Sequence, residues 1–198
     1  MNAFHLTEDQ RDCLQELINI AMGQASEQLA RYLNTFVYLQ VPNIQNIDGK
    51  YLTQVLNEEE SATDVVSQGF FGYEGIRGEA LLMYQSENLG RITDLLGFEP
   101  EELTHDEELI DISSILTTTF LNVFADQIDN KMSYNAPKIL SNVKDHLQQM
   151  AFNWDFALKV NINYQVVDYS FNCNMILLIP EMAITNIKKV INRILEDY

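Results

Sequence analysis

The chain has 198 residues, 46% of them hydrophobic, and its 29 acidic and 12 basic side chains give a formal charge of −17. Length and apolar content suffice for one compact domain with a buried core. The charge excludes nucleic-acid binding, because affinity for nucleic acids comes largely from cations that displace the counterions of phosphates. It is compatible with a basic protein partner and equally with plain solubility.

No apolar run approaches the roughly 18 residues that span a bilayer, and the amino end MNAFHLTEDQRD has no basic start followed by an apolar stretch. We therefore expect a cytoplasmic protein without a signal peptide or a membrane helix. Cys13 and Cys173 lie far apart, with no CxxC motif and no Cys/His cluster. Reduced core thiols are expected, rather than a disulfide or a metal site.

A long helix is predicted over the first 34 residues. Thr7 and Gln10 have the spacing of a capping box, and apolar residues recur at helical intervals from Cys13 to Leu29. Residues 43–50 carry turn chemistry that ends in Asp-Gly. The rest of this half is predicted to contain extended segments at residues 36–41, 62–73 and 76–84, then a short helix from Ser86 to Gly97.

After an acidic connector over residues 97–105, the same order of elements begins again. The patterns predict a long helix, two extended segments and a closing helix at residues 106–129, 155–168, 169–179 and 181–196. A shift of 95 residues superimposes the two parts of the chain (114 − 19 = 95). The shift aligns Asp12 with Glu107, Glu16 with Asp111, Asn19 with Ser114 and Pro42 with Pro137.

Apolar patterns align by chance fairly often, but the matched prolines and acids favour a true repeat. We infer a duplicated unit of helix, strands and helix, with halves at about residues 1–98 and 103–198 of a single domain. The predicted fold class is α+β, a tandem pseudo-twofold repeat whose halves form one sheet packed against the long helices.

A polar stripe about 60° wide follows one face of the first helix, at roughly 100° per residue. Its members are Asp12, Glu16, Asn19 and Gly23. An ordinary solvated helix face is the simplest interpretation. However, Asn and Gly are poor helix-interior residues, and a glycine removes side-chain bulk where a partner can approach closely. A functional face is therefore the alternative.

The spacing along this stripe resembles the signature of the CheC, CheX and FliY phosphatases of bacterial chemotaxis: Asp or Ser, three residues, Glu, two residues, Asn, 22 residues, Pro. Asp12, Glu16, Asn19 and Pro42 meet all four positions. Residues 19–25 (NIAMGQA) are also similar to the family's NIGxGNA stretch, and internal duplication is a family trait. The resemblance covers nearly the whole chain and implies a CheC-like fold.

The family's substrate is a CheY-type response-regulator receiver that carries a phosphoaspartate and holds its own Mg²⁺. The resemblance therefore implies an aspartyl-phosphate phosphatase, a hydrolase, with no cofactor or metal site of its own. In that role Asn19 positions the attacking water and Glu16 pairs with the receiver's active-site Lys, while Asp12 and Gly23 contribute to receiver binding. A carboxamide suits this task, since it holds water without bringing a negative charge against the phosphoryl oxygens.

The second copy keeps the spacing, with Glu107 and Pro137 at its ends, but Asp111 replaces Glu and Ser114 replaces Asn. We expect a degenerate, structural site there. No GxxxxGK[ST], HExxH or GxSxG motif offers another catalytic centre. A non-catalytic receiver-binding module or flagellar-switch adaptor is the competing hypothesis. Binding of a CheD-type partner is left open, as is the choice between a monomer and a homodimer.

Overall fold

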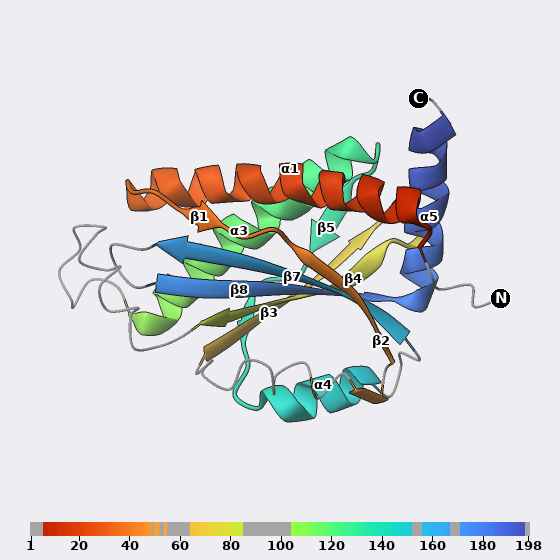
Figure 1. Ribbon diagram of the computed structural model, residues 1–198. Coiled ribbons are helices and arrows are strands. Elements are labelled where there is room, and N and C mark those ends of the chain that lie inside the picture. The colour runs from red at the N-terminus through yellow and green to blue at the C-terminus, as the bar shows by residue number, and fades with distance from the viewer. Residues whose placement is uncertain are drawn as a thin grey trace.

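The computed structural model describes residues 6–48, 50–51, 54, 64–84, 104–151, 156–166 and 171–196. Within these ranges the chain forms one antiparallel sheet with helices on both faces (Figure 1). The helices are α1 (Glu8–Leu33), α3 (His105–Gln127), α4 (Val143–Ala151) and α5 (Glu181–Glu196). The strands are β1 (Tyr38–Leu39), β2 (Asn43–Asp48), β3 (Asp64–Gly72), β4 (Arg77–Tyr84), β5 (Met132–Tyr134), β6 (Lys138–Ile139), β7 (Phe156–Val166) and β8 (Phe171–Pro180), with a short 3₁₀ turn η2 (Tyr73–Gly75) between β3 and β4.

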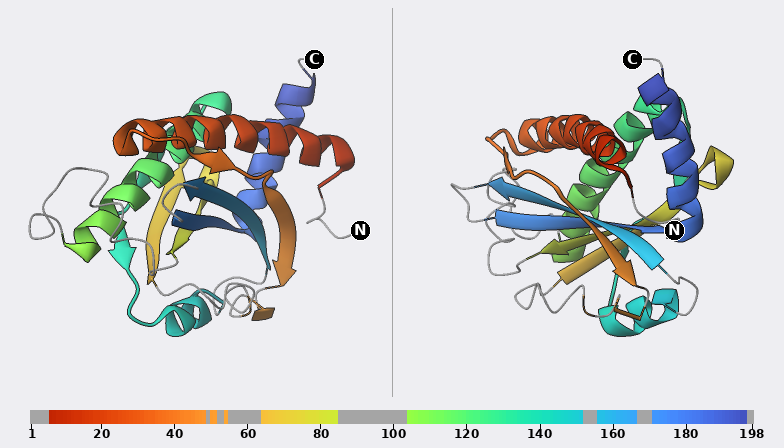
Figure 2. Two further views of the ribbon diagram at one scale, coloured as in Figure 1. Left: turned by 60° about the vertical axis from the view of Figure 1, so that its left-hand side comes forward. Right: turned by 45° about the vertical axis from the view of Figure 1, so that its right-hand side comes forward.

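The sheet has the strand order β1-β7-β8-β4-β3-β5, with β2 also paired to β7 and β6 to β3. Figures 1 and 2 show α1 and α3 over one face of this sheet, α4 beneath the other face, and α5 standing at one end. Two hydrophobic clusters follow from this layering. The larger cluster lies between the sheet and α1, α3 and α5, and the smaller lies between the sheet and α4.

The two long helices form where the sequence predicts them, with α3 at 105–127 rather than the predicted 106–129. Each starts with a capping box, formed by Thr7 and Gln10 in α1 and by Thr104 and Glu107 in α3. α1 ends at Asn34, whose left-handed backbone (φ 49°) terminates the helix. α3 is long and apolar enough to cross a membrane by length and composition, yet its apolar side packs into the main cluster. It is therefore a core helix of the domain.

The two halves are related by a pseudo-twofold arrangement about the pairing of β4 with β8. Leu81 lies opposite Ile176 across these antiparallel strands, and the two residues are 95 positions apart (176 − 81 = 95). The outer strands repeat the relation, since β1 and β2 pair with β7 just as β5 and β6 pair with β3. The predicted α+β fold, with a tandem pseudo-twofold repeat in one sheet, is confirmed. The predicted repeat boundaries near residues 98 and 103 lie outside the described residues.

The long helices α1 and α3 pack against each other in opposite directions. In the last turn of α3, Gln127 donates its Nε2 to the carbonyl oxygen of Leu17 in α1 at 2.9 Å. In the last turn of α1, burial raises the pKa of Tyr32, and the nearby negative charges of Asp111 and Glu108 raise it further. Since residues 32 and 127 are equivalent in the repeat, the end of each long helix lies beside the amino-terminal half of the other.

The structure also contains elements that the sequence patterns did not predict. The prediction of a turn at residues 43–48 is wrong, because this segment forms β2 and pairs with β7 along its whole length. The strand predicted at 36–41 is reduced to β1. β5, β6 and α4 were not predicted, and the predicted helix from Ser86 to Gly97 lies outside the described residues.

Gly78 in β4 occupies a position where a side chain would collide with its neighbours. A Cβ there would lie 2.5 Å from both the carbonyl oxygen of Leu178 and Cζ of Phe70. Overpacking of this kind costs about 1–3 kcal/mol. We expect Gly78→Ala to lower the free energy of unfolding in urea by about that amount. An unchanged unfolding midpoint would mean that the strands can shift to admit a methyl group.

Candidate functional site

The polar stripe of α1 lies on the outer side of the helix. Asp12, Glu16 and Gly23 are exposed, and Asn19 is half-buried at the edge of the stripe. Within the described part of the chain, no hydrogen bond or ion pair engages the side chains of Asp12, Glu16 and Asn19. These groups are available to another molecule.

The chain that follows α1 runs back along the helix beside Asn19. Gln15 donates its Nε2 to the carbonyl oxygen of Pro42 at 3.3 Å, and Ser26 donates its Oγ to that of Val37 at 3.5 Å. Positions 15, 19 and 26 of an α-helix lie within about 40° of one another. Asn19 therefore lies between these two contacts, on the side of α1 that faces residues 37–42. The 22 residues between Asn19 and Pro42 are thus the length of chain that completes α1, turns back and reaches the side of the helix that carries Asn19.

Gly23 leaves open space on the stripe. A Cβ added at this position would have nothing within 4 Å. Packing does not require the glycine, and alanine is the better helix former by about 1 kcal/mol. Neither packing nor helix stability therefore requires the glycine, and it leaves the surface of α1 open.

The second copy of the motif lies in the amino-terminal half of α3, near the last turn of α1. Its surroundings differ from those of the first copy. Asp111 is exposed and Ser114 is half-buried, as in the first copy. At the position equivalent to Gly23, Thr118 adds a side chain that donates its Oγ1 to the carbonyl oxygen of Ser114 at 2.6 Å. At the position equivalent to Gln15 stands Ile110, which has no donor for the carbonyl oxygen of Pro137. The second copy therefore lacks both the opening and the side-chain hydrogen bond to the returning segment.

Glu107 aligns with Asp12 in the repeat but is used by the helix itself. It is the third residue of α3, and its Oε2 accepts from the backbone N–H of Thr104 at 2.9 Å and from the Thr104 hydroxyl at 2.7 Å. The left-handed residues that follow the two long helices, Asn34 and Asp129, are 95 positions apart, but the amino-terminal caps of the helices are 97 apart (104 − 7 = 97). This displacement of two residues puts Glu107 where α1 has Gln10.

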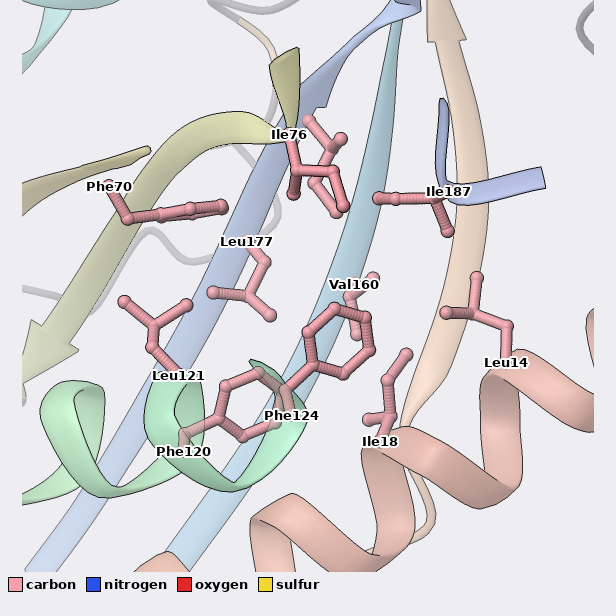
Figure 3. Close-up of a pocket in the computed structure, with 11 residues that line it drawn as sticks. Leu14, Ile18, Phe70, Ile76, Phe120, Leu121, Phe124, Val160, Leu177 and Ile187 are labelled. Carbon is pink, nitrogen blue, oxygen red and sulfur yellow. The ribbon is translucent and has the colours of Figure 1, made fainter. Parts of the chain in front are cut away.

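An apolar pocket opens in the main core between α1, α3, α5 and the sheet (Figure 3). Its volume is about 10 Å³, close to the smallest space that holds one water. It is therefore a packing defect rather than a binding site. The pocket is lined by Leu14, Ile18, Phe70, Ile76, Phe120, Leu121, Phe124, Val160, Leu177, Ile179 and Ile187.

Sequence reasoning missed the two side chains that hold the segment beside Asn19. Gln15 and Ser26 bond to backbone carbonyls, and a carbonyl leaves no residue signature in the sequence. No group of three or more His, Cys, Asp or Glu side chains able to hold a metal ion occurs among the described residues. That the protein acts without its own cofactor stays a prediction.

No protein-family model matches the chain. Solved structures match it over most of its length. FliY of Thermotoga maritima has a TM-score of 0.70 at 16% identity, covering 95% of this chain and 98% of its own. FliM in a FliM–SpeE complex from H. pylori has a TM-score of 0.67 at 13% identity, covering 96% and 97%. The chemotaxis protein CheX from Vibrio vulnificus has a TM-score of 0.54 at 12% identity, covering 83% and 99%.

At these identities the matches define the fold alone. The chain has the fold of FliY, FliM and CheX, which confirms at the level of fold the resemblance that the motif indicates. These structures do not test the roles of the individual site residues, which stay predictions.

The capping role of Glu107 makes its charge part of the stability of α3. Hydrogen bonds from the backbone and then the hydroxyl of Thr104 lower the pKa of Glu107 from its ordinary value of 4.5. A carboxyl with a lowered pKa stabilises the fold above its unfolded-state value, and this contribution is lost as the pH falls through the folded-state value. Glu107→Gln keeps a capping box like that of α1, where Gln10 holds the same position, but removes the titrating carboxyl. When the pH falls from neutral to below 4.5, the free energy of unfolding should therefore decrease less for this variant than for wild type. Denaturant titrations over this range test the difference, and parallel pH profiles would contradict it.

Substitution of Gly23 tests whether the fold requires a glycine at this position of α1. Because a Cβ meets nothing there, Gly23→Ala should raise the free energy of unfolding by about 0.5–1 kcal/mol. Thermal or urea unfolding measures this. A loss of stability would show that α1 itself requires the glycine.

Proposed function

We propose that this protein is a phosphatase that hydrolyses the phosphoaspartate of a CheY-type response-regulator receiver in cytoplasmic chemotaxis or two-component signalling. The observation that carries the proposal is the outer face of α1. There Glu16 and Asn19 lie one turn apart, engaged by no other described residue, beside a segment that returns at the interval of the family's motif. The fold shared with FliY and CheX supports it.

Hydrolysis of an acyl phosphate asks little covalent chemistry of the enzyme. A water oxygen attacks phosphorus in line with the bond to the receiver's aspartate, that P–O bond breaks, and the aspartate leaves as a carboxylate. The proton of the attacking water passes to the phosphate product or to solvent. Because the transition state is loose, rate depends mainly on positioning the water and on tolerating the phosphoryl charge. The receiver is expected to carry Mg²⁺ as part of the substrate.

Asn19 is suited to hold the attacking water. Its carboxamide accepts one hydrogen bond and donates others, so it orients a water without adding charge near the phosphoryl oxygens. It projects from α1 on the side that faces residues 37–42, which Gln15 and Ser26 hold against the helix. A residue on a packed helix has a fixed backbone position, and this lowers the entropic cost of reaching the reactive geometry.

Glu16 and its neighbours on the stripe would anchor the receiver. The exposed carboxylate of Glu16 can form an ion pair with the lysine of the receiver's active site, which becomes strong once docking excludes water. Asp12, one turn earlier, extends this acidic contact. The open surface at Gly23 lets the receiver backbone approach α1 closely, so the stabilising Gly23→Ala change should also slow dephosphorylation.

The second copy is proposed to be inactive. Ser114 is too short to reach as far as a carboxamide, Asp111 is one methylene shorter than Glu16, and Thr118 fills the opening that Gly23 provides in the first copy. We therefore assign one working face to the protein.

The proposal predicts that Asn19→Ala slows dephosphorylation of a CheY-type receiver, prepared with acetyl phosphate and Mg²⁺, by roughly 100-fold or more, because misplacing a reacting group costs about that much. Single-turnover decay of the phosphorylated receiver measures the rate. Ser114→Ala is the matched control at the equivalent position of α3 and should leave the rate unchanged. If Asn19→Ala decays as fast as wild type, the assigned mechanism is wrong.

A second candidate function is a receiver-binding or flagellar-switch adaptor without hydrolysis. The similarity to FliM, whose match covers 96% of this chain, favours it, and so does the altered second copy. Tight binding of a phosphorylated receiver with no change in its phosphoryl lifetime would select this function. A CheD-type partner and homodimer formation remain compatible with either function.

A further inference from the structure

A shallow hollow lies at the carboxyl end of α1, on the same side of the helix as Glu16. Its volume is about 400 Å³. Glu16, Gly23 and Glu27 lie within about 40° of one another on the helix, so the hollow continues the candidate catalytic stripe. The hollow is lined by Glu27, Ala30, Arg31, Asn34, Thr35 and Phe36.

Phe36 is the main apolar side chain of this hollow, and it is 82% exposed. The next residue, Val37, packs against the main core, so the backbone here is held while the ring of Phe36 stays in solvent. A single exposed aromatic residue is common on protein surfaces. The repeat shows that the fold does not need this one, because the equivalent residue of the second half is Lys131. Arg31 is likewise replaced by Asp126.

The distance along α1 places the near edge of the hollow inside a normal-sized interface centred on Asn19. Eight residues of helix separate Asn19 from Glu27, which is about 12 Å. A typical protein interface buries about 800 Å² on each partner, equivalent to a disc of about 16 Å radius. A protein that presents a phosphoryl group to Asn19 would therefore reach the near edge of the hollow, which Glu27 and Phe36 line together.

The charges along α1 differ between its two ends. The amino-terminal half exposes four carboxylates, of Glu8, Asp9, Asp12 and Glu16. At the carboxyl end, Glu27 and Arg31 form an ion pair at 2.6 Å, and their charges cancel. The exposed ring of Phe36 therefore lies beside a locally neutral pair. A complementary partner is therefore basic where it meets the first turns and apolar where it meets the end of the helix.

We infer that the hollow at Phe36 is a second docking contact for the same receiver domain, one that takes an apolar receiver side chain while basic receiver residues face the acidic half of α1. This rests on the proposed function, since the receiver is the partner that Asn19 would recognise. The contact sets affinity and selectivity among receivers and takes no part in the chemistry, because even its nearest lining residue, Glu27, lies about 12 Å from Asn19 along the helix.

The test is steady-state dephosphorylation of a CheY-type receiver by Phe36→Ala. We expect KM to rise roughly tenfold, as for loss of an aromatic anchor, with kcat unchanged. Phe36→Leu should recover most of the affinity, and the unfolding temperature should stay at the wild-type value because the ring is 82% exposed. The matched control is Phe71→Ala: Phe71 is 51% exposed and, alternating with the core residue Phe70 along β3, points to the sheet face opposite α1.

Binding of the beryllofluoride-activated receiver, measured by calorimetry, separates this inference from the proposed function. If wild type binds the activated receiver but does not hydrolyse the phosphoaspartate of the phosphorylated receiver, and Phe36→Ala weakens binding, the docking contact stands and the phosphatase function fails. If wild type hydrolyses the phosphoaspartate and Phe36→Ala keeps the wild-type KM and affinity, the docking contact is overturned and the phosphatase function stands. If wild type binds no CheY-type receiver, both are overturned.

Discussion

The pairing of β4 with β8 is the interaction on which the rest of the structure depends. It joins the strands of the two halves around Leu81 and Ile176 and turns two small sheets into one. Without it each half would expose a long strand edge, which is a liability for association, and a smaller apolar face. With it the sheet offers one continuous surface, on which α1 and α3 lie antiparallel as the pseudo-twofold relation requires.

This symmetry constrains the scaffold but leaves the surface chemistry free to differ. The strand registers and the left-handed residues after the long helices repeat, whereas the outer faces do not. Gln15 is matched by Ile110 and Gly23 by Thr118. Each of these changes alters the face of one helix and leaves the core in place. A duplicated scaffold can therefore carry one complete face and one that serves only structure.

The energetics of α1 explain how it tolerates a face made of poor helix formers. Asn19 and Gly23 together cost about 1–2 kcal/mol relative to alanine. The opposite side of α1 buries a stripe of apolar residues, and each large apolar side chain contributes about 1.5–3 kcal/mol on burial. The capping box at Thr7 adds further support. Packing therefore outweighs propensity, and the outer face is free to serve binding.

The sequence by itself determined the features that arise from local interactions. Both long helices, the capping box of α1, the polar stripe and the shift of 95 can be read from residues a few turns apart or from self-comparison, and the shift predicts the α+β repeat. The tertiary structure decided the rest. β2 became a strand because β7, more than 100 residues later, offers it a ladder of hydrogen bonds. Likewise, Gln15 and Ser26 hold the chain beside Asn19 because backbone carbonyls of the segment that follows α1 reach them. Contacts with backbone groups and with distant strands carry no residue signature, so only the folded chain shows them.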